Sequence, residues 1–221
     1  MTRILTLLFI LSTIHLAEAA DWKAIPILKS GMVSATANQN FGRSPGKTEK
    51  TALPDFASFP QTLQAASTDQ AGTDRSAKAE MRLEMEPGAI RFRGKLETTD
   101  AVPTDFLAPV ASMQGAVVVD LKIMLPNETG TLKGSFRVSA EGPAAIIPPG
   151  EKNPLPDSII AKVFVNDELV LNSVDFVSGV DKEIPPLHHG DIVTLLFQED
   201  FSMFSSGQAD LLSTFRYTFS Q

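Results

Sequence analysis

Apolar and polar residues alternate with a period of two along much of the chain, which is the pattern of half-buried β-strands. In the clearest case, residues 77–85 place Ala, Met and Leu at every second position, with Lys, Arg and Glu between them. Pro87 and Gly88 then turn the chain, and residues 90–96 continue the alternation. This predicts a hairpin with mainly acidic side chains on one strand facing basic ones on the next, so that cross-strand pairs stabilise it modestly.

Two further hairpins are predicted from the same pattern. Residues 117–125 form a long apolar run, predicted to be a central strand; a turn cluster at 126–130 and a strand at 132–138 complete the second hairpin. The third joins residues 159–165 to 169–171 through Asn166 and Asp167, which tolerate the positive φ of a tight turn.

The rest of the pattern adds shorter or weaker strands. Residues 174–176 either continue the third hairpin or form a separate strand, Gly190 and Asp191 open a strand at 192–197, and residues 33–37 and 63–65 are weaker candidates. Residues 209–219 close the chain, with Phe215, Tyr217 and Phe219 on one face. One helical turn is expected at 104–110. Roughly nine to eleven strands with turns between them predict an all-β, antiparallel β-sandwich, jelly-roll-like or of Greek-key type.

Three proline-containing segments are predicted loops: residues 43–60, 98–114 and 141–158. Loops of this length often carry function. The third could separate two subdomains, but the strand pattern is alike on both sides of it. A single domain over residues 20–221 is therefore expected.

The first residues have the pattern of a secretory signal peptide. Arg3 precedes an apolar run at 4–14, and Ala17 and Ala19 provide the small residues of a cleavage site. The run is too short for a transmembrane helix, which needs about 20 apolar residues. We expect residues 1–19 to be removed, with cleavage after Ala20 as the alternative, and no transmembrane segment to remain. The mature chain is then periplasmic or extracellular.

Composition narrows this expectation. The chain contains no cysteine, which excludes disulfides, a lipid-modified cysteine and thiolate chemistry, and an exported domain without disulfides is typical of bacteria. The net charge of −7 argues against nucleic acid as a partner.

Carboxylates are the main candidates for chemistry. Glu80, Glu84 and Glu86 share a strand face with Arg82, which is typical of a solvated surface. Glu199 and Asp200 are adjacent at the end of a strand, so their side chains diverge. Glycoside hydrolysis needs two carboxylates across a cleft, and these come from separate strands without a local signature.

The remaining polar motifs point to turns. His188 and His189 are adjacent in a turn and would form a poor chelate, and Asp69 and Asp74 are too few ligands for calcium. Asn127 begins a formal glycosylation sequon within a turn cluster. Motifs for Ser-His-Asp catalysis, zinc proteases, phosphate loops and dinucleotide binding are absent. The sequence therefore predicts no catalytic, cofactor-binding or metal-binding residue.

The layout resembles a broad group of bacterial exported β-sandwich proteins. The resemblance rests on the Ser-Ala-Thr-Ala stretch at 34–37 and on Gly-Asp before the apolar strand at 190–195. It implies export and a sandwich fold, and it carries no activity with it.

Three functions are compatible with these observations. The favoured one is a non-catalytic binding or structural module that contacts a glycan, a cell-envelope component or another protein through the loops at 98–114 and 141–158. The first alternative is an extracellular carbohydrate-active enzyme with a carboxylate pair. The second is a surface assembly subunit that self-associates or binds a partner through an edge strand, for which residues 215–219 are the candidate.

Overall fold

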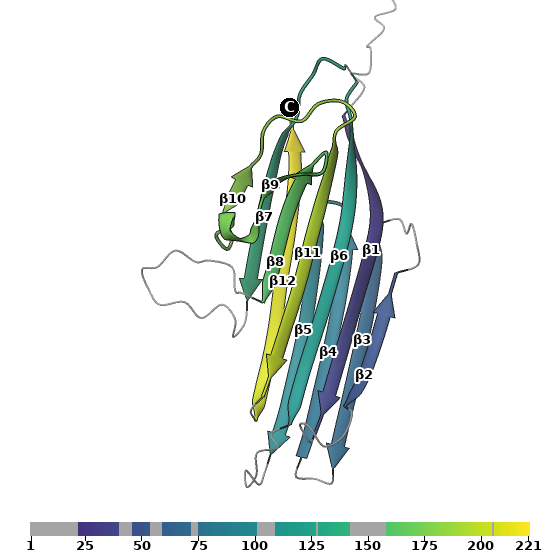
Figure 1. Cartoon of the computed structure of the whole chain (residues 1–221), viewed down its shortest axis with the longest axis vertical. Helices are drawn as coiled ribbons and strands as arrows, with labels where there is room; N and C mark the ends of the chain where they lie inside the picture. The colour runs from purple at the N-terminus through teal and green to yellow at the C-terminus, as the bar shows by residue number, and fades with distance from the viewer. Residues whose placement is uncertain are drawn as a thin grey trace, which may run out of the picture.

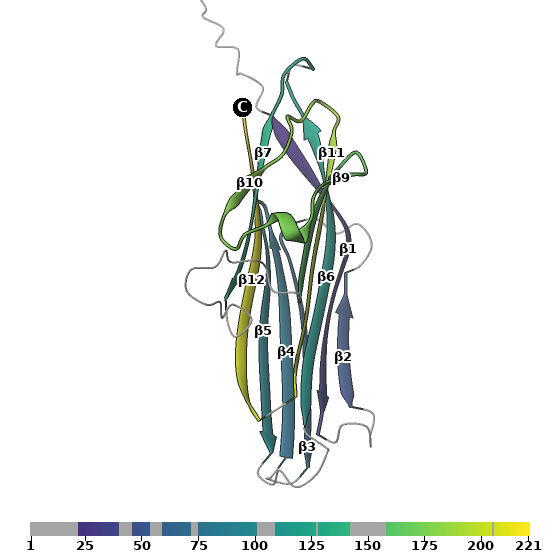
Figure 2. The ribbon, with the colours of Figure 1, turned by 60° about the vertical axis from the view of Figure 1, so that its left-hand side comes forward.

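Two antiparallel sheets of six strands each pack face to face in the computed structural model, as Figures 1 and 2 show. The structure describes residues 22–39, 46–53, 59–71, 75–100, 109–126, 128–141, 158–204 and 206–221. The predicted all-β sandwich is confirmed. The signal peptide, Asp74, Asn127, residues 104–108 of the helical turn expected at 104–110, and nearly all of the loop expected at 141–158 lie outside the described residues. The loop expected at 98–114 was predicted too long, because residues 98–100 end one strand and residues 110–114 begin another.

The first sheet, sheet A, has the strand order β2-β1-β6-β11-β8-β9. Its strands are β2 (Lys47–Ala52), β1 (Lys23–Asn38), β6 (Val110–Met124), β11 (Ile192–Met203), β8 (Ile159–Val165) and β9 (Glu168–Leu171). The long apolar run at 117–125 falls within β6, which lies between β1 and β11 and is central, as predicted.

The second sheet, sheet B, has the order β10-β7-β12-β5-β4-β3. Its strands are β10 (Asp181–Glu183), β7 (Lys133–Glu141), β12 (Gly207–Ser220), β5 (Ala89–Asp100), β4 (Arg75–Glu86) and β3 (Gln61–Ala71). A short 3₁₀ helix, η2 (Ser173–Asp175), stands where a strand was considered, so that expectation was wrong.

Two of the three predicted hairpins are present. β4 and β5 pair across Pro87 and Gly88, with Gly88 at a φ of 81°. β8 and β9 pair across Asn166 and Asp167, whose φ angles are 50° and 68°. Positive φ at both positions of the Asn166–Asp167 turn matches the right-handed twist of the flanking strands. This explains why that turn could be predicted from the sequence.

The second predicted hairpin was wrong. β6 belongs to sheet A and β7 to sheet B, so the turn cluster at 126–130 carries the chain from one sheet to the other. Alternation does not distinguish the two cases, because a strand buries one face whether its neighbour in sequence lies beside it or opposite it. The described strands number twelve, more than expected, since β2 lies inside a predicted loop and β10 has only three residues.

The core lies between the sheets and is centred on aromatic rings. Phe215 of β12 is fully buried, and its ring centroid lies 5.5 to 6.4 Å from those of Phe197, Phe176 and Phe136. Phe215 and Phe136 come from sheet B and Phe197 from sheet A, so the cluster joins the two layers. Edge-to-face packing at this spacing stabilises the sandwich beyond the area that it buries.

Candidate functional site

An apolar groove opens at the upper end of the sandwich in Figure 1, where β1 begins and β12 ends. Its volume is about 620 Å³, and both sheets and the β4–β5 turn contribute to its lining. The lining includes Trp22, Ala24, Pro26, Leu121, Tyr217 and Phe219. A groove of this size and composition suits an apolar or amphipathic ligand.

Aromatic rings hold the two sides of the groove together. The Trp22 ring, just before β1, meets the Phe219 ring of β12 edge-on, with centroids 6.1 Å apart. Phe219 in turn lies 6.1 Å from Phe136, a fully buried ring of the core. The groove is therefore an extension of the core that the two sheets leave open to solvent.

The first part of β1 has a neighbouring strand on one side only. β6 pairs with β1 from Lys23 to Asn38, whereas β2 pairs with it only from Met32 onward. A hydrogen bond of 2.9 Å from the Leu53 N–H to the Gly31 carbonyl extends that contact by one residue. Within the described part of the chain, residues 23–30 thus form a free strand edge, visible in Figure 1 as the part of β1 above β2.

The backbone groups on this edge can be assigned. Gly31 faces the interior and points its carbonyl toward β2. A β-bulge between Leu28 and Ser30 interrupts the alternation, so the first part of β1 is assigned from β6: Ala24 pairs with Ile123, whose N–H and carbonyl hydrogen-bond to Asp191 and Gly190. Paired residues of an antiparallel ladder point either both toward or both away from each other, so Ala24, and with it Pro26 and Leu28, points toward the free side. Ala24 and Leu28 offer an N–H and a carbonyl, and Pro26 offers a carbonyl only. A proline on an edge limits indiscriminate strand pairing without closing the edge.

The end of β12 borders the same groove with a second open side. β7 pairs with β12 as far as Ser220, whereas β5 stops at the pair Ala89–Arg216. The Tyr217 N–H donates to the Gly88 carbonyl at 3.1 Å, after which the chain of β5 turns away. Among the described residues no strand follows beside Thr218 to Ser220. At the groove, β1 of sheet A and β12 of sheet B therefore each have a neighbouring strand on one side only, within the described residues.

The groove has little charge. Lys23 is the one side chain among its lining residues that is charged at neutral pH. Burial raises the pKa of the Tyr217 phenol above its ordinary value of 10, so this group stays neutral. The lining thus favours apolar side chains, with free backbone groups on β1 as the polar component.

This segment of β12 also corrects one expectation. Residues 215–219 were the candidate edge strand, but β12 lies between β7 and β5 and is paired on both sides as far as Arg216. Only the last residues of β12 have an open side, and the longer free edge, at the start of β1, was not expected from the sequence, because strand order is set by contacts far apart in the chain. The groove itself had no sequence signal: it arises where β2 and the β4–β5 hairpin end.

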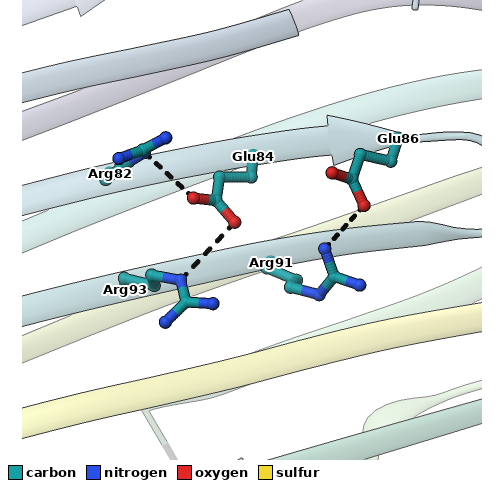
Figure 3. Close-up of polar contacts among 5 residues, drawn as sticks. All are labelled: Arg82, Glu84, Glu86, Arg91 and Arg93. Atoms are coloured by element: carbon teal, nitrogen blue, oxygen red, sulfur yellow. Dashed lines mark hydrogen bonds and ion pairs between the residues drawn. The ribbon is translucent and has the colours of Figure 1, made fainter. Parts of the chain in front are cut away.

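Of the glutamates singled out from the sequence, Glu84 and Glu86 are bound to arginines on the outer face of sheet B (Figure 3), and Glu80 is exposed and lies opposite Lys95 in the ladder. Glu84 contacts Arg82 at 3.0 Å and Arg93 at 3.4 Å, and Glu86 contacts Arg91 at 2.7 Å. The side chains of Arg82 and Arg93 are about half exposed, at 51% and 55%. The arrangement matches the predicted cross-strand pairing on a solvated face.

Replacing Glu84 with glutamine is expected to lower the free energy of unfolding by less than about 1 kcal/mol, because exposed ion pairs contribute little. Urea denaturation with Glu86→Gln as the matched control measures this. A loss above about 2 kcal/mol would contradict a purely surface role.

One other hollow brings two carboxylates together. Glu141 and Asp210 line a depression of about 400 Å³ on the outer face of sheet B, beside Arg93. The depression opens on the flat face of the sheet, and Asp210 also pairs in register with Lys95. Neither acid was singled out from the sequence, because strand register alone brings them close.

The histidines and Asp69 have local partners. His188 is exposed, and its backbone N–H donates to Asp191 at 2.7 Å. The Nδ1 of His189 lies 3.0 Å from the Leu125 carbonyl oxygen. His189 is half-buried, so the expectation of an exposed turn residue was wrong for it. Asp69 accepts a hydrogen bond of 3.2 Å from the Gln39 N–H. Among the described residues, no cluster of three or more His, Asp or Glu side chains has the arrangement of a metal site.

Glu199 and Asp200 diverge, as predicted, but with different surroundings. Asp200 points outward and accepts a hydrogen bond of 2.8 Å from the Gln114 amide. Glu199 points between the sheets and is only 4% exposed. Its Oε2 accepts a hydrogen bond of 2.6 Å from the Ser213 hydroxyl, and burial raises its pKa to about 7. Glu199 continues the alternation of the buried residues Val193, Leu195 and Phe197, and this was the signal in the sequence that could have placed it in the interior.

Comparison with known proteins assigns no family to this chain. No protein-family model, no curated protein and no solved structure matches this chain. No helix in the described part of the chain is long and apolar enough to cross a membrane. The groove and its two open strand edges are therefore interpreted on their geometry alone.

Proposed function

We propose that the chain is an exported, non-catalytic β-sandwich protein that binds an extended polypeptide segment in the upper groove by strand addition. The observation that carries the proposal is the coincidence of a free backbone edge on β1 with an apolar groove beside it. Strand addition uses both: backbone hydrogen bonds supply affinity, and alternate side chains enter a groove.

The groove is compatible with a strand in chemistry as well as shape. A bound strand would hydrogen-bond to Ala24, Pro26 and Leu28 and direct every second side chain toward Trp22, Tyr217 and Phe219. The nearly uncharged lining favours apolar residues at those positions. The binding partner expected from this chemistry is a segment that alternates apolar and polar residues, from another protein or from a second copy.

Export and compartment belong to the same proposal. A signal peptide at residues 1–19 and a cysteine-free chain support delivery to the periplasm or the exterior of a bacterium. The sandwich is proposed as a single domain over residues 20–221. Its strand order, with several crossings between the sheets, supports the jelly-roll-like or Greek-key expectation.

A binding role at the groove is preferred to carbohydrate hydrolysis. The alternative needs two carboxylates across a cleft, and the pair that comes nearest, Glu141 and Asp210, lies on an open sheet face beside Arg93. A glycan or another cell-envelope component stays a possible contact of the loops at 98–114 and 141–158.

A displayed library of random decapeptides tests the proposal. Selection against the folded protein is expected to enrich sequences that alternate apolar and polar residues. Their affinity should fall at least about tenfold in Ala24→Pro, which removes one N–H donor from the free edge, because one lost hydrogen bond costs about 1.4 kcal/mol. Isothermal titration calorimetry measures the affinity of the selected peptides for the unmodified protein and for Ala24→Pro.

Ala24→Ser is the matched control, since it keeps the N–H and changes the side chain by one hydroxyl. It is expected to bind the selected peptides as the unmodified protein does. Failure to enrich any peptide, or binding that Ala24→Pro leaves unchanged, would overturn strand addition at β1.

A further inference from the structure

Glu199 lies between the two sheets, in the second half of β11 of sheet A. It is 4% exposed, and Ser213, its hydrogen-bond partner at 2.6 Å, belongs to β12 of sheet B and is 1% exposed. The contact is therefore a buried polar link that runs from one sheet to the other. β11 and β12 follow each other in the chain, and the link joins the second half of β11 to the first half of β12. Figure 1 shows β11 ending and β12 beginning at the same end of the sandwich.

In the described part of the chain, the strand neighbours of Glu199 and Ser213 carry no positive charge. Beside it in sheet A lie Gly115 of β6 and Ile159 of β8. Beside Ser213 in sheet B lie Phe92 of β5 and Ala140 of β7. None of these four residues titrates.

Charged side chains next to these positions in sequence, in the described part of the chain, point to the outer faces of the sheets. Asp200 is bonded to Gln114 on the outside of sheet A, and Glu141 and Arg93 line a hollow on the outside of sheet B. Among the described residues, the other buried acid on an inward face is Asp69 of β3, which lies 3.9 Å from Lys47. Glu199 differs from Asp69 in its partner, which is the Ser213 hydroxyl and not a cation.

An ionised carboxylate without a cation is costly to bury, whereas a neutral carboxylic acid with a hydroxyl partner is tolerated. We propose that Glu199 and Ser213 form a pH-sensitive clasp between the two sheets, closed when Glu199 carries a proton and weakened when it ionises. The proton leaves to solvent. The Ser213 hydroxyl favours the charged form in place, but the cost of burial outweighs it, so ionisation favours local separation of β11 from β12, which lets water reach the carboxylate.

The raised pKa of about 7 supports this geometry, because it places the change of state within the physiological range. In the open state the carboxyl group is solvated and returns toward its ordinary value of 4.5. Between these two values the equilibrium constant for opening is expected to rise by about tenfold per pH unit, and to level off above pH 7.

Hydrogen exchange followed by mass spectrometry between pH 4.5 and 8.5 tests the clasp. After correction for the intrinsic pH dependence of exchange, peptides from the second half of β11 and the first half of β12 should lose protection steeply up to about pH 7. Peptides from the β3–β4 hairpin should keep theirs. A flat profile for β11 and β12 in the unmodified protein, or an equal loss in both regions, would overturn the proposal.

Two variants separate the clasp from other acids. Glu199→Gln keeps the hydrogen-bonding shape without a titrating group and is expected to abolish the pH dependence in β11 and β12. Asp200→Asn, the exposed neighbour, is expected to retain the profile of the unmodified protein. If Glu199→Gln does not fold, Ser213→Ala serves instead: removal of the hydroxyl should increase opening at high pH, and an unchanged profile would count against the clasp.

Discussion

Replacing Glu199 with glutamine is expected to make the protein more stable at pH 8 and to remove most of the pH dependence of its stability. The folded protein holds the Glu199 proton with a pKa of about 7, against an ordinary value of 4.5. Between these values the folded state binds more protons than the unfolded state, so the free energy of unfolding falls as pH rises. The contribution is fully present below pH 4.5 and lost above pH 7.

The difference between the two pKa values corresponds to about 3 kcal/mol between pH 4.5 and pH 8. Glutamine resembles the neutral acid at every pH, so the variant should keep this free energy at pH 8. Urea denaturation of both proteins at pH 4.5, 6 and 8 measures it. Asp200→Asn is the control, with a pH profile parallel to that of the unmodified protein. Parallel profiles for Glu199→Gln as well would show that Glu199 is not the titrating group.

Truncating Phe215 to alanine should cost about 3 to 5 kcal/mol of stability, the usual range for a fully buried phenylalanine. The ring contacts Phe197 of sheet A as well as Phe136 and Phe176, so its removal leaves a cavity where the two layers meet. The backbone of β12 is paired on both sides at this position, which limits how far the site can collapse.

Equilibrium denaturation in urea measures this loss, with Phe204→Ala as the matched control. Phe204 is 58% exposed, so the same truncation there should cost less than about 1 kcal/mol. Similar losses at the two positions would mean that the ring cluster does not link the sheets as described.

Local features of the fold were predictable from the sequence, and the arrangement of strands was not. The β4–β5 and β8–β9 hairpins were legible because their turn residues and alternation act over a few positions. The crossing from β6 to β7 resembles a hairpin in sequence, because a turn cluster between two alternating segments fits both connections. Only contacts between distant segments decide which sheet receives the next strand.

The candidate sites divide in the same way, into features set by nearby residues and features set by distant ones. Glu84 and Glu86 were correctly interpreted as a surface, since their neighbours in sequence include the arginines that bind them. Glu199 and Asp200 were correctly expected to diverge, but burial of Glu199 depends on β12, fourteen residues away at Ser213. The groove depends on where β2 and β5 end relative to β1 and β12, a property of register that no single segment carries.

The strand order has a consequence for how the chain folds. β1 pairs with β6, β6 pairs with β11, and Thr98 of β5 lies opposite Gly207 of β12. Each of these ladders closes a long loop of chain before its hydrogen bonds form, so the entropy cost comes early and folding is expected to be slow, in the range of milliseconds to seconds. A chain that has emerged as far as the end of β6 holds β1 and β6 without β11 or β12. Its exposed strands need protection from aggregation until the last part of the chain arrives.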